Sequence, residues 1–98
     1  GYNIYPVEIE LALCEHPGIG LAAVLPIPHP IFQEVGHAFI EAPEGQIDER
    51  ELRDFLKSRL ANYKIPKVFS FEPALPKLPN MKIDKQALKK RLEQGEAV

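Results

Sequence analysis

The sequence lacks the features that would place it in several common classes of protein. Its 98 residues contain a single cysteine, Cys14, so no internal disulfide can form, which fits a reducing compartment. No apolar run approaches the roughly 20 residues of a membrane helix, and no signal peptide is recognised. The net charge of −2 provides no basic field for nucleic acid or an anionic membrane. These absences favour a cytoplasmic protein with no nucleic-acid partner and no membrane span.

Self-contained catalytic and metal sites are missing as well. The six glycines are scattered, so there is no glycine-rich phosphate-binding loop. His16, His29 and His37 lie in separate segments without a helical pair or a nearby cysteine pair, and we expect turn and strand-surface residues there. Ser58 and Ser70 lack the context of a nucleophile elbow. The sequence therefore predicts no metal site.

What remains fits one small α+β domain. A chain of this length builds a single modest core, and its apolar periodicity predicts six elements. These are a helix over 6–16, strands over 19–27 and 35–42, a helix over 47–63, a strand centred on 68–71, and a helix that begins after Asp84. This order predicts a three-stranded sheet packed against about three helices. Residues 1–98 form one domain in this interpretation, and the tail 93–98 is expected to fray.

Side-chain spacing predicts how the first two helices begin and which faces they bury. Pro6 suits the first position of a helix, where its missing N–H costs nothing. Val7, Leu11 and Cys14 then share one apolar face at helical spacing. Asp48 is the expected N-cap of the second helix. The apolar stripe of that helix comprises Leu52, Phe55, Leu56 and Leu60.

The stretch LPKLPNMKIDKQAL, residues 75–88, gives one lysine a distinctive setting. Prolines bound the loop on one side. On the other side Asp84 is the predicted N-cap of the last helix, with Ile83 and Leu88 placed as a hydrophobic staple. Lys82 therefore has a fixed root, and its ammonium could neutralise a carboxylate or a phosphate as a compact point charge. Exposed loop lysines are common, so these residues alone leave open whether Lys82 is ordinary surface or a delivered charge.

Four segments, in this order along the chain, resemble the C-terminal domain of the adenylate-forming superfamily. They are GYNIYPVEIE, HPGIGLAAVLPIPHP, LANYKIPKVFSFEPALP and LPNMKIDKQALKKRL. The superfamily includes acyl- and aryl-CoA synthetases, the adenylation domains of peptide synthetases, and luciferases. The resemblance covers the chain from Gly1 to about Leu92, and it rests on the order and spacing of all four segments.

The resemblance implies a two-step enzyme whose substrates are ATP with Mg, a carboxylic acid and coenzyme A. The acid first reacts with ATP to give an acyl-adenylate and pyrophosphate, and a thiol then displaces AMP. A large N-terminal domain, the implied partner, holds most of the acid and nucleotide site. The C-terminal domain is a lid that rotates between the two steps. The chain is then this lid, a fragment of a longer enzyme that is inactive alone.

Single residues also acquire roles through the resemblance. Pro76 and Lys82 match the family pattern of proline, four residues, glycine and lysine, so Lys82 is the implied adenylation lysine. Its ammonium would offset the repulsion between the carboxylate and the α-phosphate. Met81 stands where the family usually has glycine, and we expect it to reshape the loop or to touch the acyl group. In the turn after residue 28, His29 and Gln33 replace the usual aspartate and glycine.

The first residues match the segment that faces the pantetheine tunnel during thioester formation. Gly1 matches the glycine that lets the thiol arm pass, and Tyr2 and Asn3 could line the same wall. A plain strand entry is the alternative for these residues. Two rival functions also stay open for the whole chain: an adenylation domain that loads a carrier-protein pantetheine, and a non-catalytic α+β binding module.

Overall fold

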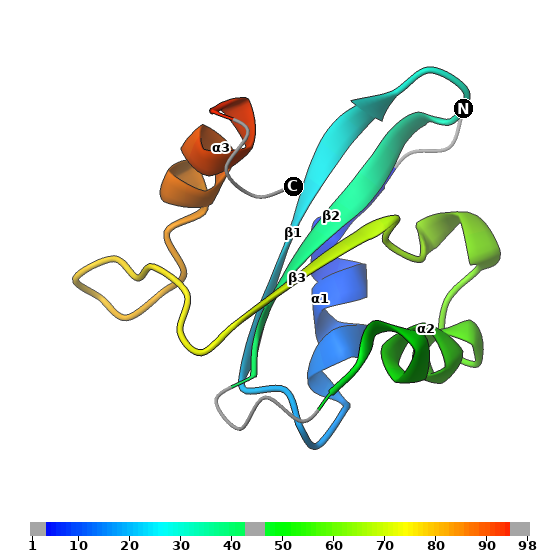
Figure 1. Ribbon diagram of the computed structural model, residues 1–98, viewed down its shortest axis with the longest axis horizontal. Coiled ribbons are helices and arrows are strands. Elements are labelled where there is room, and N and C mark those ends of the chain that lie inside the picture. Colours follow the sequence, from blue (N-terminus) through cyan, green and yellow to red (C-terminus); the bar gives the residue numbers. More distant parts are fainter. Residues whose placement is uncertain (1–3, 43–46, 95–98) are drawn as a thin grey trace.

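A computed structural model of the chain describes residues 4–42 and 47–94. Its elements, in chain order, are α1 (Pro6–Cys14), β1 (Leu21–His29), β2 (Gln33–Glu41), α2 (Glu49–Lys57), the 3-10 helix η1 (Asn62–Lys64), β3 (Val68–Glu72) and α3 (Lys85–Glu93). The predicted α+β class, with three helices around a three-stranded sheet, is confirmed (Figure 1). Within these described ranges, no helix is long and apolar enough to cross a membrane.

The sheet has the order β1-β2-β3, which makes β2 its central strand. β2 pairs antiparallel with β1, with Val24 opposite Ala38, and parallel with β3, with Ala38 opposite Phe69. A parallel pair needs a crossover connection, and α2 with η1 lies in that connection. The sheet separates the helices, because α1 and α2 lie on one side of it and α3 lies on the other (Figure 1).

β1 continues through Pro28, which the sequence analysis placed beyond the end of the strand. The strand includes Pro26 and Pro28 and reaches His29. Pro26 lies opposite Gly36 of β2, and Pro28 lies opposite Glu34. β1 is an edge strand, where a missing N–H is tolerated when it faces away from the neighbouring strand. The expected end of the strand near residue 27 is therefore wrong.

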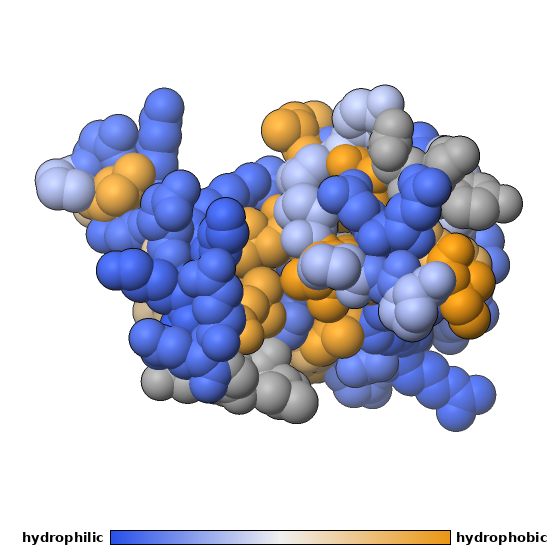
Figure 2. All heavy atoms as spheres, turned by 90° about the horizontal axis from the view of Figure 1, so that it is seen from above, coloured by the Kyte–Doolittle hydropathy of each residue, from blue (hydrophilic) through white to orange (hydrophobic). Residues whose placement is uncertain are grey.

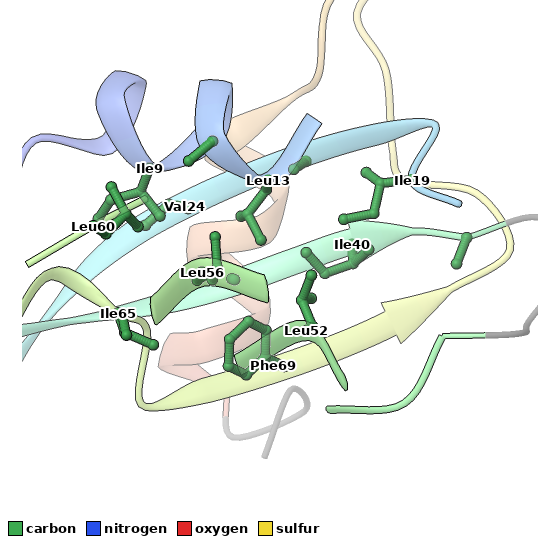
Figure 3. Packing of buried hydrophobic residues seen from close by; sticks show 14 of the residues in the cluster. Ile9, Leu13, Ile19, Val24, Ile40, Leu52, Leu56, Leu60, Ile65 and Phe69 are labelled. Carbon is green, nitrogen blue, oxygen red and sulfur yellow. The ribbon is translucent and has the colours of Figure 1, made fainter. Parts of the chain in front are cut away.

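The main hydrophobic core fills the space between the sheet and helices α1 and α2, and this side is called the α1/α2 face below. Figure 3 shows Ile9 and Leu13 of α1 and Leu52 and Leu56 of α2 between their helices and the sheet, on the side where Ile40 of β2 lies. All five side chains are fully buried. Each contributes about 1.5–3 kcal/mol of hydrophobic transfer free energy, so this face holds most of the apolar packing.

The buried face of α1 is not the one expected from the sequence. Ile9 and Leu13 are fully buried, whereas Val7 and Leu11 are 64% and 66% exposed and Cys14 is exposed. Both sets have helical spacing, because α1 is apolar nearly all the way round. Periodicity therefore predicted the helix correctly but could not choose between its two apolar faces.

α2 begins as predicted and ends earlier. Asp48 is its N-cap, since the Oδ1 of Asp48 accepts the N–H of Glu51 at 2.6 Å. The predicted stripe packs into the core, with Leu52, Leu56 and Leu60 buried and Phe55 partly buried against it. The predicted extension to residue 63 is wrong. The helix ends at Lys57, and Ala61 takes an extended backbone with ψ of 147° before η1 begins.

The opposite side of the sheet, called the α3 face, holds a smaller cluster. Its buried members are Ala23, Phe39, Leu75 and Leu88, with Leu25, Ile83 and Leu92 packed partly buried against them. Ile83 packs against the cluster that contains Leu88, which agrees with the predicted staple. Asp84 is the N-cap of α3, as expected, and its side chain accepts the N–H of Ala87.

His37 lies on the α3 face and is only 2% exposed, which contradicts the expected strand-surface position. Its ring stacks on Phe39 with centroids 4.4 Å apart, and its Nε2 hydrogen-bonds the Ser70 hydroxyl at 2.8 Å. Burial, and then the nearby charge of Arg91, lowers the pKa of His37, which favours the neutral ring. A central strand covered on both faces buries its polar positions too.

The β1–β2 turn contains two residues that depart from the family pattern, His29 and Gln33. Gln33 has a φ of 68°, a left-handed value that suits glycine. His29 Nδ1 accepts the N–H groups of Ile31 and Phe32 at 3.1 and 3.2 Å. An aspartate side chain bonds backbone groups in the same way at the start of a turn, so the ring nitrogen replaces the carboxylate there.

Candidate functional site

The segment from Lys77 to Ile83 folds into a small hairpin, called the lysine hairpin below, that carries Lys82. Lys77 and Ile83 pair in an isolated antiparallel bridge. Leu78 N–H donates to the Lys82 carbonyl at 2.7 Å, and Met81 N–H donates to the Leu78 carbonyl at 2.9 Å. These two bonds are typical of a three-residue hairpin turn whose last residue is left-handed and commonly glycine. Lys82 is the first residue after that turn.

Met81 occupies this left-handed position, with a φ of 71°. It therefore adopts the backbone conformation for which glycine is best suited, at a cost of about 1–2 kcal/mol for a residue with a side chain. The hydrogen bonds of the turn form without glycine. The side chain is 71% exposed, so contact with an acyl group of a bound substrate stays a prediction.

The root of the hairpin is fixed at its C-terminal side. Asp84 N–H donates to the Pro76 carbonyl at 2.9 Å, which joins the two ends of the hairpin. Its carboxylate caps α3 through the N–H of Ala87 at 3.1 Å. Ile83, between Lys82 and the cap, packs against the cluster of the α3 face. The residue that follows Lys82 is thus held by apolar packing and the next one by hydrogen bonds.

The N-terminal side of the hairpin rests on Glu41, the last residue of β2. Glu41 Oε1 accepts the N–H of Leu75 and the ammonium of Lys77, both at 2.8 Å. The Lys77 hydrogen bond, and then the Leu75 hydrogen bond, lowers the pKa of Glu41 against the opposing effect of burial. Leu75 itself is 3% exposed and belongs to the α3-face cluster. A carboxylate and an apolar anchor therefore hold this end of the hairpin to the sheet.

Lys82 differs from the lysines on either side of it. Lys77 pairs with Glu41, and the ammonium of Lys85 lies 2.7 Å from Glu10 of α1. Lys82 is exposed, and its ammonium forms no hydrogen bond or ion pair with any residue in the described ranges. Lys77 and Lys85 are thus engaged in ion pairs within the domain, whereas the Lys82 ammonium is available to an anion outside it.

The position of the hairpin suits such a contact. In Figure 1 it extends away from the sheet below α3. In the view from above, the same end of the molecule stands apart from the body as a narrow protrusion (Figure 2). An ammonium carried there reaches a partner without a rearrangement of the core. Chemically, it can hold two anionic reactants together and stabilise charge that develops between them.

The other predicted site residues lie outside the described residues: Gly1, Tyr2 and Asn3. Among the residues that are described, no group of three or more His, Cys, Asp or Glu side chains is placed to hold a metal ion.

Sequence reasoning overlooked Glu41. A signal was present, because Glu41 is an acid that ends an apolar strand and has to share the face of Phe39. Its partner Lys77, however, is distant in the sequence.

Known proteins with similar sequences are several times longer than this chain. It is 40% identical over 88 residues to a 2-succinylbenzoate–CoA ligase of Bacillus licheniformis, and 39% identical over 92 residues to a fatty acid–acyl-carrier-protein ligase of Streptomyces coeruleorubidus. These alignments cover 90% and 93% of this chain but only 18% of each relative. The fold matches a solved fatty acyl CoA synthetase of Mycobacterium tuberculosis with a TM-score of 0.86 and 33% identity. That match covers 97% of this chain and 19% of the synthetase.

A family profile accounts for most of the chain. The profile described as the AMP-binding enzyme C-terminal domain matches residues 8–82, from the first turn of α1 to Lys82. It thus includes the whole sheet, α2 and nearly all of the lysine hairpin. The chain belongs to the family of C-terminal domains of AMP-binding enzymes.

Proposed function

We propose that the chain is the mobile C-terminal lid of an AMP-forming ligase that joins a carboxylic acid to coenzyme A. The observation that carries the proposal is Lys82, whose exposed ammonium pairs with none of the described residues and lies at the end of a hairpin whose two sides are anchored. The chain spans about a fifth of the length of its relatives. The remaining part of the enzyme, the large N-terminal domain, would hold the acid and most of the nucleotide.

In the first step, Lys82 acts as an electrostatic clamp. A carboxylate oxygen attacks the α-phosphorus of ATP, the bond to the bridging oxygen breaks, and pyrophosphate leaves. The two reactants repel each other because both are anionic. An ammonium between them offsets this repulsion, and it stabilises the negative charge on the attacking and bridging oxygens. Mg enters this step with ATP, as part of the substrate.

In the second step the lid rotates, and a thiol attacks the acyl carbon of the adenylate and displaces AMP. Lys82 then has no part in the reaction, because the lid presents another face. We place Gly1, Tyr2 and Asn3 beside the pantetheine arm in this state, as the resemblance implies.

We also propose that the parent enzyme is cytoplasmic, in line with the single cysteine of this chain.

The acceptor thiol has two candidates. One relative is named a CoA ligase and another a ligase of an acyl carrier protein, at nearly equal identity to this chain. Both acceptors end in the same pantetheine thiol, so Lys82 would act alike in either enzyme. We propose coenzyme A, with a carrier protein as the alternative. Rates of thiol transfer with each acceptor, measured on the full-length enzyme, separate them.

Replacement of Lys82 tests the proposal in the full-length enzyme. Lys82→Ala should lower ATP–pyrophosphate exchange by about 10²–10³-fold, the effect of removing one preorganised electrostatic contact. Transfer of the acyl group from a preformed adenylate to the thiol should stay largely unchanged. Lys90→Ala is the matched control, because Lys90 is an exposed lysine of α3 that lies outside the hairpin. It should leave both steps intact.

Two other outcomes would argue against the assignment. Equal loss in both steps would reject a role confined to adenylation. An unchanged exchange rate would favour the non-catalytic binding module. The tunnel assignment has its own test: Gly1→Leu should spare exchange and slow thiol transfer, since a side chain there obstructs the thiol arm. A Gly1→Leu enzyme that loses exchange first would contradict it.

A further inference from the structure

Glu41 is the one acidic side chain of β2 that reaches the lysine hairpin. Its side chain is 13% exposed, and a single oxygen, Oε1, accepts both the Leu75 N–H and the Lys77 ammonium. The Lys77 ammonium donates in addition to the Leu75 carbonyl at 3.2 Å. The three groups therefore form a closed triangle under the base of the hairpin.

This triangle is connected to Lys82 by few bonds. The backbone of Lys77 pairs with Ile83, the residue next to Lys82. The Pro76 carbonyl accepts the N–H of Asp84 from the other strand of the hairpin. A shift of residues 75–77 would therefore move the two residues that follow Lys82. Leu75 and Ile83 add apolar packing at the root of the hairpin, whereas Leu78 and Met81 of the turn itself are exposed.

The element that supplies Glu41 is the central strand of the sheet. β2 is paired on both sides, and Glu41 lies opposite Leu21 of β1 and Glu72 of β3. Ala42, the next residue, still donates its N–H to the Glu72 carbonyl at 2.9 Å. The carboxylate is thus mounted on a fixed backbone, and it transmits the orientation of the sheet to the hairpin.

We propose that Glu41 is a positioning residue for adenylation, which holds the lysine hairpin in the orientation in which Lys82 meets the acid and ATP. The proposal rests on the proposed role of Lys82. Glu41 touches no reactant and acts through Lys77 and Leu75. A misplacement of about 1 Å at a reacting group costs as much as 10²-fold in rate, so a small movement of the hairpin is enough to slow adenylation. The second step does not use Lys82 and is unaffected.

The test compares variants of the full-length enzyme in both half-reactions. Glu41→Ala should lower the kcat of ATP–pyrophosphate exchange by about 10–100-fold and leave thiol transfer from preformed adenylate unchanged. Glu41→Gln should lose less, because its amide oxygen still accepts the Leu75 N–H while the ion pair with Lys77 is gone. Lys77→Met removes the same ion pair from the other side and should match Glu41→Gln. These two milder variants decide the question if Glu41→Ala fails to fold.

Glu72→Gln is the matched control. Glu72 lies opposite Glu41 in the sheet, is 21% exposed and pairs with Arg91 of α3 instead of the hairpin. Its loss should cost similar stability, measured by thermal unfolding, without a selective loss of exchange. The proposal is wrong if Glu72→Gln slows exchange as much as Glu41→Gln, or if Glu41 variants slow both half-reactions equally.

A double variant separates this proposal from the role of Lys82. In the Lys82→Ala background, Glu41→Ala should cause no further loss of exchange, since residues that act as a unit are not additive. An additive loss would show that Glu41 acts independently of Lys82 and would overturn the positioning role. If Lys82→Ala alone leaves exchange intact, the proposed function itself fails, and that result is read without any Glu41 variant.

Discussion

The two faces of the sheet differ in how much apolar packing they hold. On the α1/α2 face, fifteen of the described apolar residues form one buried cluster beneath two helices (Figure 3). On the α3 face the apolar cluster has four buried members. Polar groups fill the remainder: His37 bonds Ser70, Glu41 bonds Lys77, and a bidentate pair joins Glu72 to Arg91.

The two faces therefore contribute differently, one mainly to the stability of the domain and the other to the orientation of the elements packed against it. Apolar burial is strong but has no direction, so it suits the face that holds the domain together. Charge-assisted hydrogen bonds to β2 and β3 are directional, and they connect the sheet to the lysine hairpin and to α3. The polar contacts of the α3 face thus help to fix the orientation of the lysine hairpin and of α3, while the other face supplies most of the buried apolar packing.

The largest effect is expected from α1, where two leucines of one helix lie on opposite sides. Leu13→Ala should lower the free energy of unfolding by about 3–4 kcal/mol, because it leaves a cavity in the main core. Leu11→Ala is the control, since Leu11 is 66% exposed, and it should change stability by about 0.5 kcal/mol or less. Urea unfolding of the 98-residue chain measures both. Equal losses of stability in the two variants would indicate that the face of α1 predicted from the sequence, which contains Leu11, is buried as well.

A smaller effect, confined to one region, is expected from Leu88 of α3. Leu88 is fully buried, but its cluster has few members and can partly collapse. Leu88→Ala should cost about 2 kcal/mol. Amide hydrogen exchange should show faster opening of α3 and the hairpin while β2 stays protected, as expected of a unit with local stability. Uniform acceleration across the sheet would mean that both faces unfold as one unit.

The helices and the caps of α2 and α3 could be predicted from the sequence because each depends on local signals, whereas the role of Lys82 rests on the family resemblance and stays a prediction. Asp48 and Asp84 lie at fixed offsets from the N–H groups that they cap. The side of α1 that is buried could not be predicted, because both of its faces are apolar. The burial of His37 depends on β3 and α3, which approach from remote segments. Glu41 depends on Lys77 in the same way, and this partner lies 36 positions further along the chain.

Acid should weaken the α3 face before the α1/α2 face. The pKa of His37 is lowered by burial and by Arg91, so its neutral ring contributes stability at neutral pH. This contribution is lost as the pH falls below the ordinary value of 6.5 and through the lowered pKa. The pKa of Glu41 is also lowered, so its contribution is lost only below the ordinary value of 4.5.

Urea unfolding as a function of pH should therefore show two successive declines in stability. His37→Gln removes the titrating ring and can still hydrogen-bond Ser70, so it should flatten the first decline. Glu41→Gln should flatten only the second decline. If the first decline persists in His37→Gln, the acid sensitivity arises elsewhere and the contrast between the two faces loses this support.

The smallest effect is expected at Met81, where backbone strain is independent of either core. Met81→Gly should raise the free energy of unfolding by about 0.5 kcal/mol, because relief of the left-handed strain exceeds the entropy that glycine adds to the unfolded chain. The side chain is 71% exposed, so little packing is lost. Gln33→Gly, at the only other described non-glycine residue with positive φ, should raise the free energy of unfolding in the same way and serves as the matched variant.

Of these two residues, only Met81 lies beside Lys82. If Met81→Gly also raises the KM for the acid in the full-length enzyme while Gln33→Gly does not, the methionine contacts the acyl group. An unchanged KM in both variants would leave Met81 with a purely conformational role.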